Sequence, residues 1–62
     1  METEAAYLYR RASEEREWSR VDGSATAKLA HLSMADYLES LARAVEARRR
    51  RLALYDVNVS SG

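Results

Sequence analysis

Only one internal segment of this chain is suited to ending a helix: Asp22-Gly23-Ser24. The 62 residues contain no proline, and the other glycine is Gly62. Glycine favours the left-handed conformation that often follows a helix, and Asp or Ser can cap the helix that comes next. Two helical stretches separated by so short a break predict an all-α antiparallel helical hairpin.

The first predicted helix covers residues 3–21. Thr3 is placed to cap its N-terminus, and Glu4 puts a negative charge in the first turn, where the helix dipole favours it. Glu17 and Arg20 are spaced to form an ion pair on the outer side. Residues at helical spacing form a weak inner stripe: Ala5, Leu8, Ala12, Glu15, and Trp18 or Ser19.

The second predicted helix covers residues 25–54, about 45 Å at 1.5 Å per residue. Two acid–base pairs at i,i+4 spacing, Glu39 with Arg43 and Glu46 with Arg50, are expected to support it. Residues 1–55 are predicted to form one domain, followed by a flexible tail over 56–62. Positions that step by three and four predict one apolar face: His31, Met34, Leu38, Leu41, Val45, Arg48, Leu52 and Tyr55.

The two predicted helices differ in length, so the first covers the second only as far as about residues 43–45. Residues 45–55 are then expected to project uncovered. The core is also thin, because 11 of the apolar residues are alanine and a domain this small is marginally stable alone. These features predict a homodimeric four-helix bundle, with a protein interface on the second helix: Met34, Tyr37, Leu38, Leu41, Val45, Leu52, Leu54 and Tyr55.

The sequence offers little for catalysis. It has one histidine and no cysteine, and it lacks a glycine-rich phosphate loop, a nucleophilic triad and a zinc-binding pattern. His31 is predicted to be half-buried at the hairpin seam. Glu15, on the inner stripe, is expected to pair with Arg11 or to reach His31 or Lys28. We therefore predict a non-enzymatic protein without a cofactor, and a metal or small-molecule site near His31 is the least favoured alternative.

Four successive arginines are the most unusual feature: Arg48, Arg49, Arg50 and Arg51, here called the arginine run. With Arg43 they form a basic patch that could bind nucleic acid or an acidic protein. Consecutive residues spread around a helix, however, and do not make a one-sided patch. The structural alternative is that these charges stabilise a helix C-terminus while their stems cover apolar neighbours.

Net charge and hydropathy bound the location and the partners. The chain carries 10 basic and 10 acidic residues, so no global field draws it to nucleic acid or to an anionic membrane. It has no apolar run long enough to span a bilayer and no apolar segment behind an acidic N-terminus. We expect no membrane insertion, no signal peptide and a cytoplasmic location, with the chain itself or another helical protein as partner.

Two short patterns resemble a known group of proteins. Tyr9-x-Arg11-Ala12-x-x-Glu15 is followed, after a short loop, by His31-Leu32-x-Met34-Ala35. This is similar to the short uncharacterised helical-hairpin proteins of alphaproteobacteria, over residues 7–38. The final tyrosine of the pattern falls one position early, at Tyr37, and the arginine-rich extension is not part of it. The resemblance implies an α-hairpin and is compatible with an interaction role, and it carries no activity.

Overall fold

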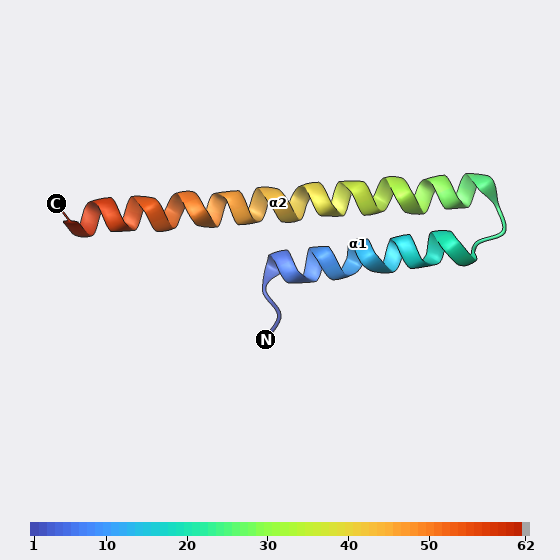
Figure 1. Cartoon of the computed structure of the whole chain (residues 1–62), viewed down its shortest axis with the longest axis horizontal. Helices are drawn as coiled ribbons and strands as arrows, with labels where there is room; N and C mark the ends of the chain where they lie inside the picture. The colour runs from blue at the N-terminus through green and yellow to red at the C-terminus, as the bar shows by residue number, and fades with distance from the viewer. Residues whose placement is uncertain (62) are drawn as a thin grey trace.

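The computed structural model describes the backbone of residues 1–61 and the side chains of residues 1–55. It consists of two helices, α1 (Glu4–Val21) and α2 (Ala25–Ser61), which run antiparallel and are joined by the short loop 22–24 (Figure 1). The predicted all-α helical hairpin is therefore confirmed. The C-terminal part of α2 projects beyond the N-terminal end of α1, as the unequal helix lengths predict.

Side-chain caps begin both helices. The Thr3 hydroxyl accepts a hydrogen bond from the Ala6 N–H at 3.1 Å, and the Ser24 hydroxyl accepts one from the Ala27 N–H at 3.3 Å. These bonds satisfy backbone donors that the first turn of a helix leaves free. The sequence predicted the Thr3 cap and offered Asp22 or Ser24 for the second, and both helices begin within a residue of their predicted starts.

Gly23 does not take the left-handed conformation that the sequence suggested, because its φ is not positive. Asp22 ends α1 in an extended conformation, with φ −75° and ψ 133°. Its carboxylate accepts a hydrogen bond from the Ser24 N–H at 3.0 Å. This local Asx-type bond turns the chain without any left-handed residue.

The second helix is longer than predicted. It was expected to end near Leu54, and it continues to Ser61. The predicted tail therefore starts inside α2, and its side chains lie outside the described residues. Val and Asp lower helix propensity by less than about 0.7 kcal/mol each, and no glycine or proline stands between Ser24 and Ser61 to end the helix.

The helices pack through small side chains spaced seven residues apart. In α1 these are Ala5, Ala12 and Ser19, and in α2 they are Ala35 and Ala42, all buried. Seven residues span two helical turns, so each set forms one line along its helix. Small side chains on facing lines allow the two backbones to approach closely. No large side chain is fully buried among the described residues.

The residues that flank these lines divide the hairpin into two sides. Leu38 and Glu39 follow Ala35 by three and four positions, so they lie on opposite sides of it. The same pattern follows Ala5, Ala12 and Ala42. We call one side the polar side, with Tyr9, Arg16, Glu39 and Glu46, and the other the apolar side, with Leu8, Leu38 and Val45. The buried Glu15, three positions after Ala12, also lies on the apolar side.

The molecule is elongated and thin. Its radius of gyration is 16.4 Å and its principal extents are 58 × 22 × 9 Å, whereas a compact 62-residue domain has a radius of gyration of about 11 Å. A single layer of two helices has no interior beyond the line where they touch. Large apolar side chains therefore stay exposed on both helices.

Candidate protein interface

The predicted apolar face of α2 is turned partly away from α1. The buried line runs through Ala35 and Ala42, one residue on from Met34 and Leu41, where the sequence centred the face. Met34 and Leu41 are consequently 46% and 37% exposed. Seven of the eight predicted interface residues share this face, which we call the α2 apolar face: Met34, Tyr37, Leu38, Leu41, Val45, Leu52 and Tyr55.

Exposure varies systematically along the α2 apolar face. Leu38 and Val45, nearest the seam, are half-buried against α1. Tyr37, Leu52 and Tyr55 are 60%, 54% and 65% exposed, and the last two lie on the projecting part of α2. The apolar surface thus extends from the hairpin onto the projecting segment, with Arg48 lying between Val45 and Leu52.

Leu54 does not belong to this surface. It is 66% exposed, as predicted, but it follows Leu52 by only two positions. Two residues turn an α-helix by about 200°, so Leu54 points to the opposite face of α2. The prediction placed it in the interface because it considered exposure and not helical phase.

The first helix contributes to the same side of the hairpin, which the sequence analysis missed. Leu8 lies three positions after Ala5 and is half-buried. Trp18 is 47% exposed and meets the His31 ring edge-on at a centroid distance of 5.9 Å. The Arg11 guanidinium lies over the Trp18 ring at 5.5 Å. The signal was available, because Leu8 and Trp18 lie on one side of the Ala5, Ala12 and Ser19 line.

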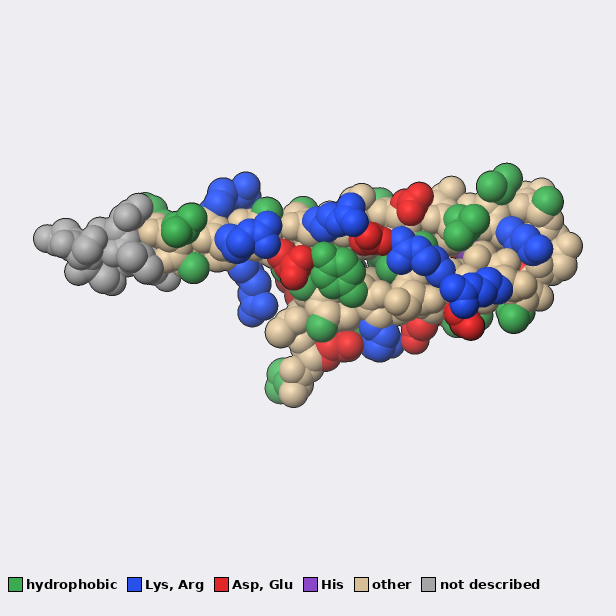
Figure 2. Space-filling view, viewed as in Figure 1, with side chains coloured by type: hydrophobic (Ala, Val, Ile, Leu, Met, Phe, Trp, Pro, Cys, Tyr) green, Lys and Arg blue, Asp and Glu red, His purple; other side chains and the backbone are tan. Residues whose placement is uncertain are grey.

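The polar side is held by hydrogen bonds between the helices. The Tyr9 hydroxyl donates to Glu46 at 2.7 Å, and Arg16 binds Glu39. Glu39 also pairs with Arg43 at 2.5 Å, as predicted, whereas Glu46 bonds Tyr9 and not its predicted partner Arg50. Figure 2 shows a face of the hairpin on which basic and acidic side chains interleave along both helices.

These contacts shift the ionisation of the groups involved. The Arg16 hydrogen bond holds the pKa of Glu39 below its usual value. The bond to Glu46 raises the pKa of Tyr9. The polar groups of the polar side therefore have hydrogen-bond partners within one chain. Large apolar side chains on the other side remain exposed to solvent.

Glu15 is the buried charged residue of the seam. Its side chain is 8% exposed, and it bonds His31 Nδ1 at 2.8 Å and Arg11 at 3.1 Å. The bond to His31, with help from Arg11, holds the pKa of Glu15 below its usual value. His31 Nε2 lies 3.7 Å from an Asp22 carboxylate oxygen. The predicted Glu15 contacts with Arg11 and His31 are thus confirmed. The contact with His31 joins α1 to α2 in the half of the hairpin nearer the loop.

Within the described residues, no group of three or more His, Cys, Asp or Glu is arranged to hold a metal ion. No buried polar side-chain atom of the described part lacks a hydrogen-bond partner. Glu15 and His31 are hydrogen-bonded to each other across the seam.

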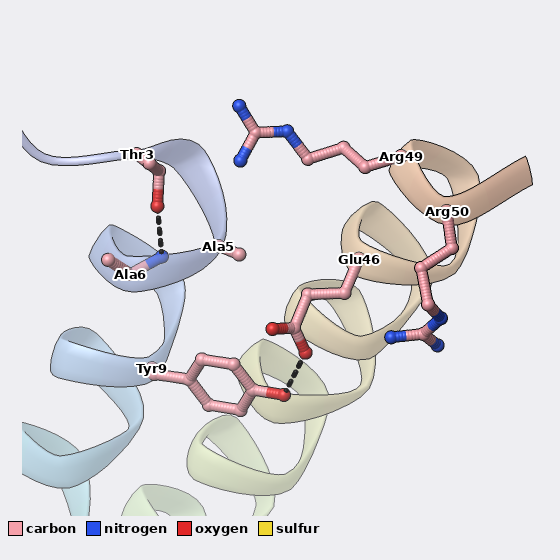
Figure 3. Close-up of a pocket in the computed structure, with 7 residues that line it drawn as sticks. All are labelled: Thr3, Ala5, Ala6, Tyr9, Glu46, Arg49 and Arg50. Carbon is pink, nitrogen blue, oxygen red and sulfur yellow. Dashed lines mark hydrogen bonds between the residues drawn. The ribbon is translucent and has the colours of Figure 1, made fainter. Parts of the chain in front are cut away.

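The arginine run surrounds α2 and does not form a patch. Arg49 and Arg50 line a groove beside the first turn of α1 together with Tyr9 and Glu46, which are hydrogen-bonded to each other (Figure 3). Arg48 lines a second groove with Glu4 and Leu52, among others. All four arginines are exposed. Among the described side chains, the ion pairs do not include any of them.

No family model, curated protein or solved structure matches the chain. The resemblance to alphaproteobacterial helical-hairpin proteins therefore stays a prediction. Over the described residues, neither helix combines the length and the apolar character needed to cross a membrane.

Proposed function

We propose that this chain is a small non-catalytic protein–protein interaction module that associates with itself through the α2 apolar face. The observation that carries the proposal is the exposure of Met34, Tyr37, Leu41, Leu52 and Tyr55 on one side of a hairpin whose own core is built from alanine. Exposed apolar patches of this kind mark interaction sites. Its role would be that of an adaptor, a regulator or an accessory subunit.

The accessible area supports association. The chain exposes 4914 Å², whereas a compact monomer of 7.0 kDa exposes about 4,000 Å². The excess of about 900 Å² is close to the roughly 800 Å² that each partner buries in a standard protein interface. A second chain would bring the exposed area per chain back to an ordinary value.

Light scattering over a dilution series, with helicity followed in parallel, tests the proposal. We expect a mass of twice the 7.0 kDa chain at micromolar concentration or above. The double variant L41D/L52D puts charges on the α2 apolar face and should leave a monomer. L54D changes the same residue type on the opposite face and should still dimerise. A fully helical wild-type monomer, or a dimer unaffected by L41D/L52D, would refute the proposal.

Nucleic-acid binding is the second candidate, and the exposure of all four residues of the arginine run favours it. Phosphate contacts release counterions, so binding would be strongest at low salt and would fall steeply as salt rises. Fluorescence anisotropy with labelled DNA and RNA at about 50 mM salt decides it. A lack of binding there removes this candidate.

A further inference from the structure

We infer that the partner of the α2 apolar face is a second copy of this chain whose α2 runs antiparallel to the first, with the twofold axis near Leu41. The inference rests on the proposed self-association and adds the orientation of the partner. The two α2 helices could pair antiparallel or parallel, and both arrangements would bury similar apolar residues. The charges of α2 favour the antiparallel one.

The position of the axis follows from the extent of the apolar face. Two small residues, Ala27 and Ala30, continue the α2 apolar face toward the loop, and Tyr55 is its last described member. A twofold interface uses the same patch on both chains, so the patch must be centred on the axis. The midpoint between residues 27 and 55 is Leu41, and each position i then lies level with 82 − i of the partner.

Side-chain sizes agree with this register. Leu52, 54% exposed, lies level with Ala30 of the second copy. Tyr55, 65% exposed, lies level with Ala27. Large side chains thus meet small ones, which is the pattern that lets facing helices interdigitate. A parallel pair would set Leu52 against Leu52 and Tyr55 against Tyr55.

Charge gives the strongest argument. In a parallel pair the two arginine runs would lie side by side, about 8–10 Å apart as packed helices are. In the antiparallel pair their centres are 17 positions apart along the axis, or about 26 Å. That distance exceeds the Debye length of about 8 Å at physiological salt. The antiparallel arrangement therefore removes most of the repulsion between eight arginines.

The segment that each arginine run meets carries no lysine or arginine. The run lies level with positions 31–34 of the other copy, His31, Leu32, Ser33 and Met34. The run therefore does not meet a basic segment in the antiparallel pair. Arg48 lies level with Met34, which its aliphatic stem can cover.

This arrangement also gives the projecting part of α2 a place to dock. Arg49 and Arg50 still lie beside the first turn of α1, and α2 extends past the N-terminus of α1 beyond them (Figure 1). The projecting part is thus shorter than the predicted 45–55, because Val45 and Glu46 contact α1. In the antiparallel pair, residues 51–55 lie along positions 27–31 of the second copy, beside the exposed Trp18, which contacts His31 at that level. Each projecting segment then completes the partner's hairpin, and the four helices overlap in one bundle.

Disulfide mapping tests the orientation, because the chain has no native cysteine. Cysteines join only when their Cα atoms come within about 7 Å. An equimolar mixture of A30C and L52C chains should form a mixed disulfide in air. L52C alone should not form its own disulfide, because its two copies would lie far apart. Mass measurements on each variant establish first that it remains dimeric and helical.

The outcomes separate the inference from the proposed function. A monomeric wild-type chain would overturn both. A dimer in which L52C joins to itself, or in which A30C and L52C do not join, would overturn the antiparallel arrangement and leave the interaction module standing. Spin labels at A53C give an independent reading: the antiparallel pair places them about 36 Å apart along the axis, and a parallel pair places them side by side.

Discussion

Gly23 is the residue whose sequence signal and structural role differ most. It adopts no positive φ, and a Cβ added there would meet nothing within 4 Å. Alanine fits such a position without strain and reduces the freedom of the unfolded chain. We therefore expect G23A to stabilise the protein by about 0.4–1 kcal/mol, measured by urea unfolding at one fixed protein concentration.

The neighbouring cap supplies the control. S24A removes the hydroxyl that accepts the Ala27 N–H and should lower the free energy of unfolding by about 0.5–2 kcal/mol. If G23A also destabilised the protein, the loop would require the glycine conformation that the sequence first suggested.

Acid should weaken the hairpin through its paired carboxylates. Glu15, Glu39 and Glu14 have pKa values below the usual 4.5, because hydrogen bonds from His31, Arg16 and Arg11 respectively favour their charged forms. A group whose pKa is lower in the folded state stabilises that state above its unfolded pKa. The contribution is then lost as the pH falls through the folded pKa. Thermal melts should therefore show a constant midpoint above about pH 5 and a decline below about pH 4.5.

The variant E39Q makes the acid prediction specific. It removes one of these carboxylates, so its melting midpoint should start lower at pH 7 and decline less between pH 4.5 and pH 3. E17Q changes an exposed pair with Arg20 and should leave the decline as in the wild type, because exposed pairs contribute little. An E39Q profile parallel to the wild type would contradict the assignment.

The contact between α1 and α2 depends on side chains that are small, and a larger one should disrupt it. Ala42 is fully buried on the line that faces α1. Leucine there would overpack the closest approach of the helices and should lower the free energy of unfolding by about 1–3 kcal/mol. Chemical denaturation of A42L measures the loss.

Ala53 provides the matched control for A42L. It lies 11 residues on, about three turns, so it points in nearly the same direction from α2. It is exposed because α1 does not reach it. Since Ala and Leu have nearly equal helix propensities, A53L should change stability little. An equal loss in both variants would mean that helix propensity, and not packing against α1, controls the effect.

The helix starts and the loop could be predicted, because Thr3, Asp22 and Ser24 act on backbone groups next to them in sequence. The Glu15 contacts could also be predicted, since Glu15 interrupts an inner stripe. The rotation of α2 could not be predicted from its large residues. Those residues mark the widest apolar face, whereas two helices in close contact pack through their smallest side chains.

The signal for that contact was nevertheless present. The seven-residue spacing of Ala5, Ala12 and Ser19, repeated by Ala35 and Ala42, marks the facing lines directly. The predicted end of α2 was wrong for a different reason. Weak helix formers after Tyr55 suggested a boundary, but a helix ends where a residue or a cap stops it, and no such signal occurs there.

At the scale of the molecule, the two sides of the hairpin complement each other. Tyr9, Arg16, Glu39 and Glu46 join α1 to α2 on the polar side, and they fix the angle at which α2 presents its apolar face. Variants of the polar side should therefore weaken association indirectly, by loosening the hairpin, whereas variants at Leu41 or Leu52 should weaken it directly. Helicity measured on the dissociated chain distinguishes the two effects.

If folding and association are coupled as proposed, the melting temperature must depend on protein concentration. Each tenfold increase in concentration adds about 1.4 kcal/mol to the stability of a dimer. For two chains of 62 residues, the unfolding entropy of about 2.1 cal/mol/K per residue converts this to a rise of about 5 °C. Melts by circular dichroism from 2 to 200 µM, a range chosen to span two decades (about 10 °C in total), measure the slope. The monomeric L41D/L52D variant should show no slope, and a wild-type midpoint independent of concentration would mean that the hairpin folds without a second copy.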